Sequence, residues 1–154
     1  MPAKLFHVLT LFPRLLWAAP CTLIGALLAV PALLAGGSAR RVHRAIEISL
    51  YPTRCPAGTL VRHLPFSAIT FGHVIIAISG DEMARLRAHE HAHVRQYERL
   101  GIFFLLAYPA SSLAAVLRGQ SPHKHNRFEI QAISEAASFV EPGEAWRNGT
   151  DRSA

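Results

Sequence analysis

The sequence has few charged residues for its length. Asp, Glu, Lys and Arg make up 17% of the 154 residues, whereas apolar residues make up 51%. A soluble domain normally carries about 25% charged residues. The shortage of charge therefore argues against an ordinary soluble domain and directs attention first to membrane-associated segments.

Cysteine is also scarce and occurs only at Cys21 and Cys55. Cys21 lies inside a long apolar run, so we do not expect the geometry that a disulfide with Cys55 requires. Neither residue belongs to a Cys-x-x-Cys pair, which is the spacing of thiol redox motifs and of many zinc sites. The cysteines thus predict neither a disulfide nor a thiol-based site, and they do not indicate a redox compartment.

Acidic residues are fewer than basic ones, which gives a formal net charge of +6. A basic chain favours nucleic acid or an anionic membrane surface as a partner. The basic residues are scattered, except for Arg40, Arg41 and Arg44, which directly follow an apolar run. Because no basic stripe or nucleic-acid-binding module is present, we expect a membrane as partner and no nucleic acid.

The apolar run from Leu15 to Gly36 contains no charged residue. At the helical rise, a run of this length reaches about 33 Å, enough to cross a hydrocarbon core of about 30 Å. Trp17 near its start is typical of a membrane interface. The run predicts an N-terminal membrane helix, while a buried helical hairpin broken at Pro20 or Pro31, or a signal peptide, remains open.

Basic residues are more numerous after this run than before it. Cytoplasmic flanks carry an excess of Lys and Arg, so we expect the C-terminal domain to be cytoplasmic. The chain then divides into a membrane-associated segment (residues 1–40), a metal-binding domain (residues 41–141) and a disordered polar tail (residues 142–154).

Two segments in the first half of the domain have strand character. Residues 45–51 alternate apolar and polar side chains with a period of two. Residues 68–78 are rich in β-branched side chains, and we expect one strand bent at Gly72. Together the two segments predict a small antiparallel sheet.

Ser79 and Glu82 match the S-x-x-E capping box, which satisfies free amide donors at the start of a helix. This pattern predicts a helix over residues 80–100, and Gly101 is a suitable end for it.

Two further helices are expected after Gly101. Residues 102–117 are apolar but short for a membrane span, which suits a buried or interfacial helix. Asn126 is expected to cap a last helix over residues 127–140. The predicted fold class is therefore α+β, with a mainly helical core, a small antiparallel sheet and an N-terminal membrane helix or hairpin.

The helix over residues 80–100 contains the pattern H-E-x-x-H at residues 89–93. His89 and His93 are one turn apart on one helix face, so both imidazoles can reach one cation at about 2.0–2.1 Å. Glu90 leans to the side, where it can take a proton from a metal-bound water and return it to a leaving amine. The pattern predicts a zinc site with Glu90 as catalytic residue; a His-rich helix without metal is the alternative. His91 cannot share the face and is expected to be a bystander.

A zinc site of this kind needs a third protein ligand and keeps a fourth position for water or substrate. Glu129 opens the last helix and is our candidate; its alternative role is a cap at the amide of Asn126. His123 and His125 in the preceding loop are further candidates. Glu135 points about 120° away from Glu129 on a helix and cannot serve the same site.

The segments H-E-H-A-H-V-R-Q-Y-E-R-L-G and H-N-R-F-E-I-Q-A together resemble zincin metallopeptidases of the gluzincin kind, over residues 68–135. The resemblance implies a zincin-like fold, Zn2+ on His89, His93 and Glu129, and Glu90 as general base. It also implies an edge strand that docks a peptide by β-augmentation, here at residues 71–75. The segments G-H-V at residues 72–74, R-Q-Y-E at residues 95–98 and N-x-F-E at residues 126–129 also resemble a family of small bacterial membrane-associated proteins. That likeness covers most of residues 15–135, and no function carries over from it.

Four further residues are predicted to support the site or to contact substrate: His73, Gln96, Tyr97 and Asn126. Gln96 and Tyr97 follow His93 by three and four residues, where outer partners of a zinc ligand are usual. Their alternative roles are packing for Tyr97 and solvation for Gln96. His73 and Tyr97 are also possible groups to hold an oxyanion. Glu98 is expected to be an exposed partner of an arginine.

These patterns predict a membrane-associated zinc-dependent hydrolase that acts on a peptide or protein. The alternative is a non-catalytic or structural membrane protein whose metal stabilises the fold. Two imidazoles and one carboxylate suit zinc among the divalent ions.

Overall fold

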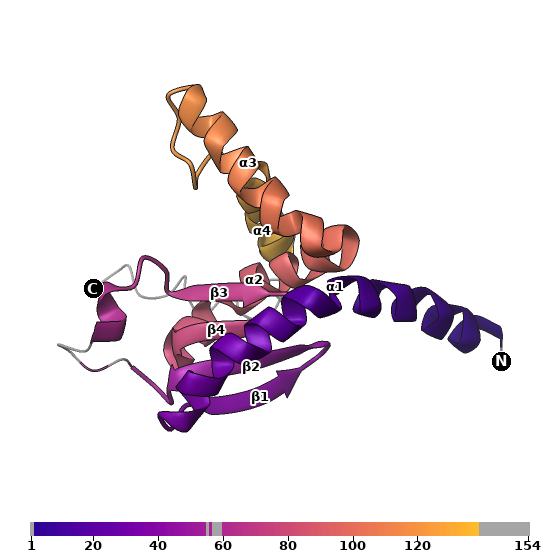
Figure 1. Ribbon diagram of the computed structural model, residues 1–154, viewed down its shortest axis with the longest axis horizontal. Coiled ribbons are helices and arrows are strands. Elements are labelled where there is room, and N and C mark those ends of the chain that lie inside the picture. The colour runs from indigo at the N-terminus through magenta and orange to yellow at the C-terminus, as the bar shows by residue number, and fades with distance from the viewer. Residues whose placement is uncertain (1, 55, 57–59, 139–154) are drawn as a thin grey trace, which may run out of the picture.

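A four-stranded sheet lies between the long N-terminal helix and the helix that carries H-E-x-x-H (Figure 1). The computed structural model describes residues 2–54, 56 and 60–138. The expectations for Cys55, for the helix beyond residue 138 and for the tail from residue 142 lie outside these residues. The described elements are, in chain order, α1 (Pro2–Leu34), β1 (Ser38–Val42), β2 (Ala45–Tyr51), η1 (Leu60–His63), β3 (Ala68–Phe71), β4 (Val74–Ser79), α2 (Gly80–Leu100), η2 (Gly101–Phe103), α3 (Phe104–Leu117) and α4 (Arg127–Ser138).

The strand order is β1-β2-β4-β3, and the sheet is mixed. β1 pairs with β2, and β3 with β4, in antiparallel fashion, but β2 and β4 are parallel, with Ile48 opposite Ile76. The expectation of a purely antiparallel sheet is therefore wrong. The reason is that β3 returns along the sheet before β4 begins, so β4 enters from the same end as β2.

Gly72 lies in a tight turn between two strands, so the expected single bent strand is wrong. The loop from β3 to β4 has only two central residues, and Gly72 has a φ of +59°. A glycine at the first central position of such a loop is typical of a type II′ hairpin turn. A Cβ at Gly72 would lie 2.5 Å from the backbone nitrogen of Thr22, which also requires glycine. Within residues 68–78 the edge strand is thus β3, whereas Val74 and Ile75 are buried in the neighbouring β4.

α1 is one continuous helix through Pro20 and Pro31, so a hairpin broken at either proline is wrong. Its small residues Ala18, Cys21, Gly25 and Ala29 are buried at helical spacing. Ala29 packs against Ile48, Val74 and Ile76, which cover this face of the sheet. The predicted boundary at residue 40 falls within β1, and α1 shares a core with the rest of the chain.

α2 covers the opposite face of the sheet, where Met83 and Val94 pack on Ala45, Ile75 and Ala77. Neighbouring residues of β4 point to opposite faces because side chains alternate along a strand. The capping prediction is confirmed, since the amide of Glu82 donates to Ser79 Oγ at 3.2 Å. The bounds of α2 agree with the predicted residues 80–100.

α3 projects away from the sheet, and α4 returns beside α2 (Figure 1). Only Phe104 and Ala115 of α3 are buried, which contradicts the buried alternative for most of this segment, whereas the interfacial alternative stays a prediction. Asn126 caps α4 as predicted, because its Oδ1 accepts the amide of Phe128 at 2.9 Å. By length and composition, Leu16–Leu34 and Gly80–Leu117 are apolar enough to cross a membrane.

Candidate metal centre

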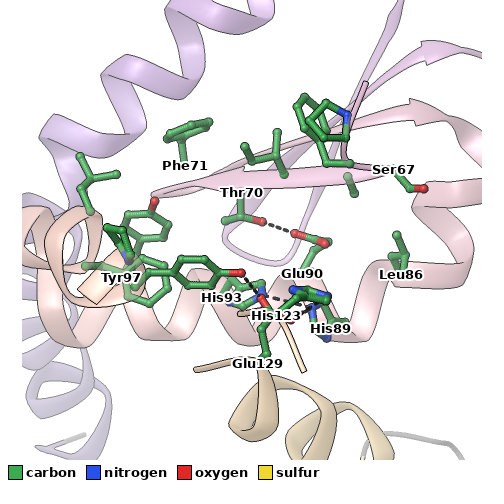
Figure 2. A pocket seen from close by; sticks show the side chains of 18 of the residues that line it. Ser67, Thr70, Phe71, Leu86, His89, Glu90, His93, Tyr97, His123 and Glu129 are labelled. Carbon is green, nitrogen blue, oxygen red and sulfur yellow. Dashed lines mark hydrogen bonds and ion pairs between the residues drawn. The ribbon is translucent and has the colours of Figure 1, made fainter. Parts of the chain in front are cut away.

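Three side chains from two helices converge at one point: His89 and His93 of α2, and Glu129 of α4 (Figure 2). The two Nε2 atoms of the histidines are 3.1 Å apart. Glu129 Oε2 lies 3.2 Å from His89 Nε2, and Glu129 Oε1 lies 3.3 Å from His93 Nε2. The predicted ligand residues are therefore brought together, and they could hold a metal ion.

These separations fit a tetrahedral ion. At ligand distances of about 2.0–2.1 Å, tetrahedral geometry places neighbouring donor atoms about 3.3–3.4 Å apart. The two imidazole nitrogens, 3.1 Å apart, are within a few tenths of an ångström of that spacing, and each of them faces one oxygen of the Glu129 carboxylate. Glu129 Oε2 is buried, and no hydrogen bond reaches it from the described residues, although His89 is close. A buried oxygen without a hydrogen bond normally has another partner, and a cation would be a suitable partner for Glu129 Oε2.

Gln96 fixes the orientation of His93. The amide nitrogen of Gln96 donates to the carbonyl oxygen of Phe128 at 3.0 Å, so its oxygen is the atom that faces His93. His93 Nδ1 is 2.8 Å from that oxygen and must donate a proton to it. His93 Nε2 is then left with a free electron pair that points at Glu129 and His89, as a metal ligand requires. The predicted supporting role of Gln96 thus has a geometric basis.

Glu129 is held as a carboxylate. Its side chain is 3% exposed, and burial alone would raise its pKa. His89 and His93, together with the Tyr108 hydroxyl that donates to Oε1 at 2.6 Å, outweigh burial and hold the pKa of Glu129 well below its usual value. The capping alternative is not realised, because the amide of Asn126 donates to the carbonyl oxygen of His123 instead.

His93 is buried beside this carboxylate. Burial lowers the pKa of its imidazole, but the hydrogen bonds with Glu129 and Gln96 more than compensate and raise it. Only the protonated form of His93 carries a proton on Nε2, where a cation would bind, so metal binding competes with protonation here.

Glu90 lies beside the three ligand residues, on the side of β3 (Figure 2). It is 5% exposed, and its Oε2 accepts a hydrogen bond from the Thr70 hydroxyl at 2.7 Å. Thr70 is in the edge strand, so the strand that would dock a substrate also holds the predicted general base. No sequence motif indicates this contact, because Thr70 is an ordinary residue of a β-branched run.

A cavity of about 810 Å³ opens in front of these residues. One wall is the segment from Pro65 to Phe71, which includes β3; α2 forms the floor, and the start of α3 forms the opposite wall. The lining is mostly apolar and aromatic, whereas the polar groups gather at His89, Glu90, His93 and Glu129. This is the usual composition of a ligand site, with a few polar groups that define the chemistry.

The structure places the other candidate ligands around the same point. His123 Nε2 is 3.6 Å from Glu129 Oε2, on an exposed loop beside the cavity. His125 is exposed and does not belong to the ligand group. Glu135 is one side of an ion pair with Arg95 at 2.8 Å, in agreement with its exclusion as a ligand.

His73 does not join the metal centre. Its Nδ1 is 3.1 Å from Thr22 Oγ1, and its Nε2 is 3.3 Å from Glu98 Oε1. Glu98 also contacts Arg44 at 3.3 Å, but it is only 5% exposed, so the expectation of an exposed partner is wrong. Glu98 is thus buried beside His73 and Arg44, and His73 does not line the cavity.

The two remaining predicted residues, Tyr97 and Asn126, have mainly structural contacts. Tyr97 packs against Ala18, Cys21 and Phe104, and it also lines the cavity. Asn126 is fully buried, and its amide nitrogen donates to Ser112 Oγ at 2.8 Å and to the carbonyl oxygen of Tyr108 at 3.0 Å. It therefore holds α4, and with it Glu129, against α3.

Comparison with protein-family models, with curated proteins and with solved structures finds no match to this chain. The arguments about function consequently rest on the geometry of the site. The arrangement offers two imidazoles and a carboxylate for a cation, with a second carboxylate beside them in an apolar cavity. Such a set can bind a divalent ion and move a proton next to it.

Proposed function

We propose that the protein is a membrane-associated zinc-dependent hydrolase of the zincin type that cleaves peptide bonds. The convergence of His89, His93 and Glu129 carries the proposal, because residues from two separate helices place their donor atoms within 4.8 Å of one another. Two imidazoles and a carboxylate that leave a fourth position open are typical of catalytic zinc sites.

Glu90 is the catalytic base in this proposal. Zinc in such a site polarises a substrate carbonyl and lowers the pKa of water. The Glu90 carboxylate lies beside the ligand group and accepts the water proton, which it then delivers to the leaving amine. Thr70 donates to the same carboxylate and holds it in place. Gln96 fixes the tautomer of His93, and Glu129 supplies the negative charge that binds the cation.

The geometry of β3 supports a polypeptide as the substrate class. Among the described strands, β3 pairs with β4 alone, so no described strand occupies its other edge. Residues of β3 line the cavity in which Glu90 lies. An extended peptide that pairs with this edge would be positioned by main-chain hydrogen bonds beside the proposed base.

The test compares the wild type with Glu90→Gln in the full-length chain. Zinc content, measured by mass spectrometry of the purified protein, should be equal in the two. Hydrolysis of a fluorogenic peptide library should fall by about 10²–10⁴-fold, which is the range that a general base supplies. Glu82→Gln is a matched control on the same helix, because Glu82 lies outside the cavity, and it should retain full activity.

Equal zinc without peptide hydrolysis in the wild type would favour the structural alternative, in which the ion stabilises the fold. Full activity in Glu90→Gln would exclude the mechanism. The absence of bound zinc in the wild type would remove the proposal entirely.

A further inference from the structure

The outer face of α1 is covered by exposed large apolar side chains. Exposed fractions reach 66% at Leu23, 72% at Leu27 and 83% at Leu34. These residues point away from the stripe of small residues that packs on the sheet. No charged residue lies in the sequence between Arg14 and Arg40. An apolar face of this extent on a helix requires a partner or a membrane.

α3 has a similar surface. Leu106 is 70% exposed, Leu113 is 58% exposed and Leu117 is 80% exposed. The sequence between Arg99 and Arg118 also contains no charged residue. Both helices thus leave large aliphatic side chains uncovered over most of their length.

The two surfaces are continuous at η2. The rings of Trp17 and Phe103 are 5.8 Å apart, and these side chains are 47% and 56% exposed. Gly101 allows this contact, because a Cβ there would lie 2.6 Å from Trp17 Nε1. In Figure 1 the start of α3 meets α1 at this point. We call the joint surface of α1 and α3 the apolar ridge.

A lipid bilayer fits the apolar ridge better than a second copy of the chain. Exposed Arg41 follows α1, and exposed Arg118 and Lys124 follow α3, so basic residues flank the ridge where anionic headgroups would be. Trp17 and Phe103 provide the aromatic side chains that are typical of the membrane interface. Two copies that met through this ridge would bring like charges together.

The packing of α1 determines whether this helix spans the bilayer or lies in one leaflet. A spanning helix is surrounded by lipid or by other apolar helices, but one face of α1 is covered by the protein itself. Ala18 and Cys21 pack on Tyr97 of α2 and Phe104 of α3, and Ala29 packs on the sheet. The β1 edge of that sheet carries exposed Arg40 and Arg41. A bilayer that enclosed α1 would have to enclose this edge as well, at high cost in free energy. α1 is therefore suited to lie in one leaflet with only its outer face in lipid.

The cavity adjoins the same surface. Phe104 and Tyr108 of α3 line the cavity beside the ligand group, and Leu106 of the same helix points outward. Tyr97 forms the inner wall and packs on Ala18 and Cys21 of α1. The start of α3 thus has one side in the cavity of the candidate metal centre and the other side in the apolar ridge.

We propose that the apolar ridge lies in one leaflet of an anionic bilayer and that the cavity receives polypeptides from that membrane surface. The second part rests on the proposed hydrolase function. Polypeptide segments at a membrane surface are rich in apolar residues, and the apolar walls between β3 and α3 can accept such side chains. The edge of β3 provides main-chain pairing for the extended segment.

The ridge is tested by flotation of the full chain with vesicles that contain anionic lipid. Leu106→Gln with Leu113→Gln should weaken partition by about 10–100-fold, because two exposed leucines lose their contact with lipid. Ile133→Gln on α4 is the matched control, since Ile133 is 57% exposed and lies outside the ridge; it should leave partition unchanged. Equal partition of the ridge variant and the control would overturn the proposal, as would self-association in place of vesicle binding.

The orientation is tested by quenching of single tryptophans with lipids brominated at defined depths. Trp146→Phe leaves Trp17 as one probe, and Trp17→Phe with Trp146→Phe and Leu27→Trp provides the other. The two positions are about 15 Å apart along the helix. Equal depth is expected for a helix in one leaflet, whereas a probe at residue 27 near the bilayer centre would show that α1 spans the membrane and would overturn the proposal.

The substrate class is tested with one apolar peptide in two forms, either soluble or anchored to the vesicle by a lipid. The wild type should cleave the anchored form at least about 10-fold faster, and the ridge variant should lose this preference while it cleaves the soluble form normally. Equal rates on both forms in the wild type would overturn the substrate class. No zinc-dependent cleavage of either form would instead contradict the proposed function, and the flotation result would then stand alone.

Discussion

Two carboxylates on different sides of α2 are almost equally buried, but they are neutralised in different ways. Glu47 is held by the guanidinium groups of Arg87 at 2.9 Å and Arg40 at 3.3 Å, with His91 at 3.2 Å. Among the described residues, Glu129 is contacted by imidazoles and the Tyr108 hydroxyl, and no lysine or arginine pairs with it.

The two carboxylates differ in whether charged side chains of the protein neutralise them without a bound ion. Arginine is charged at all relevant pH values, so Glu47 has permanent positive partners. An imidazole can lose its proton, so the charge of Glu129 has no permanently charged partner among the described residues. A buried charge without such a partner is costly, and a divalent cation would remove that cost. His91 therefore faces Glu47 on one side of α2, whereas His89 and His93 face Glu129 on another side.

The largest expected effect is a difference in zinc affinity between variants of His93 and of His91. His93→Ala should lower zinc affinity by more than about 100-fold, because even supporting residues of zinc ligands account for about 10–100-fold. His91→Ala should leave zinc affinity unchanged, since its imidazole faces Glu47. Competition titration with a zinc-sensitive dye measures both. Equal affinity in the two variants would contradict the assignment of the ligand residues.

Metal removal should destabilise the protein by a somewhat smaller amount. At a free zinc concentration of 100 times Kd, binding contributes about 2.7 kcal/mol, and chelation should then lower the Tm by about 5–10 °C. Glu129→Gln should abolish this shift, whereas Glu47→Gln should retain it. A chelator-induced shift that persists in Glu129→Gln would place the ion elsewhere.

Gln96 provides an intermediate effect. Gln96→Leu removes the acceptor that fixes Nδ1 of His93 and should weaken zinc binding by about 10–100-fold. The melting temperature of the chelated variant, compared with the chelated wild type, shows whether the fold itself has changed. Unaltered zinc affinity together with an unaltered fold would exclude a positioning role for Gln96.

The smallest expected effect is the pH dependence of the free energy of unfolding that Glu47 contributes. Burial raises the pKa of Glu47, but Arg87, His91 and Arg40 outweigh burial and lower it below its usual value of 4.5. A depressed pKa stabilises the fold above the unfolded value, and this contribution is lost as the pH falls through the folded value. The free energy of unfolding should therefore fall below pH 4.5, by about 1 kcal/mol from this group. Urea titrations of Glu47→Gln should show a flatter dependence in this range, and identical curves would contradict the assignment.

The parts of the fold with strong local signals were predictable. The capping pair Ser79 and Glu82 and the end at Gly101 determine α2, and Asn126 determines the start of α4. The spacing of His89 and His93 on a helix predicted two candidate metal ligands, and the carboxylate of Glu129 near the start of the last helix was the candidate for a third. These features depend on neighbours in sequence, which a single chain displays.

Features that depend on distant partners were missed. β1 is an exposed edge strand with the sequence S-A-R-R-V, so it has no apolar alternation to reveal it. A single glycine in an apolar run fits a bend as well as a turn, and close contact with Thr22 selects the turn. Glu47, Tyr108 and Thr70 have no motif, because their partners come from other elements.

The bridge between α2 and α4 has a consequence for local opening. His93 and Glu129 belong to helices that are joined only through α3 and an exposed loop, and Arg95 with Glu135 links the same two helices. An ion shared by the two helices would act as a cross-link that closes this long loop, much as a disulfide does. Amide hydrogens of α4 would then exchange with solvent at rates governed by ion release, so slow exchange in this one helix would record how tightly the ion is held.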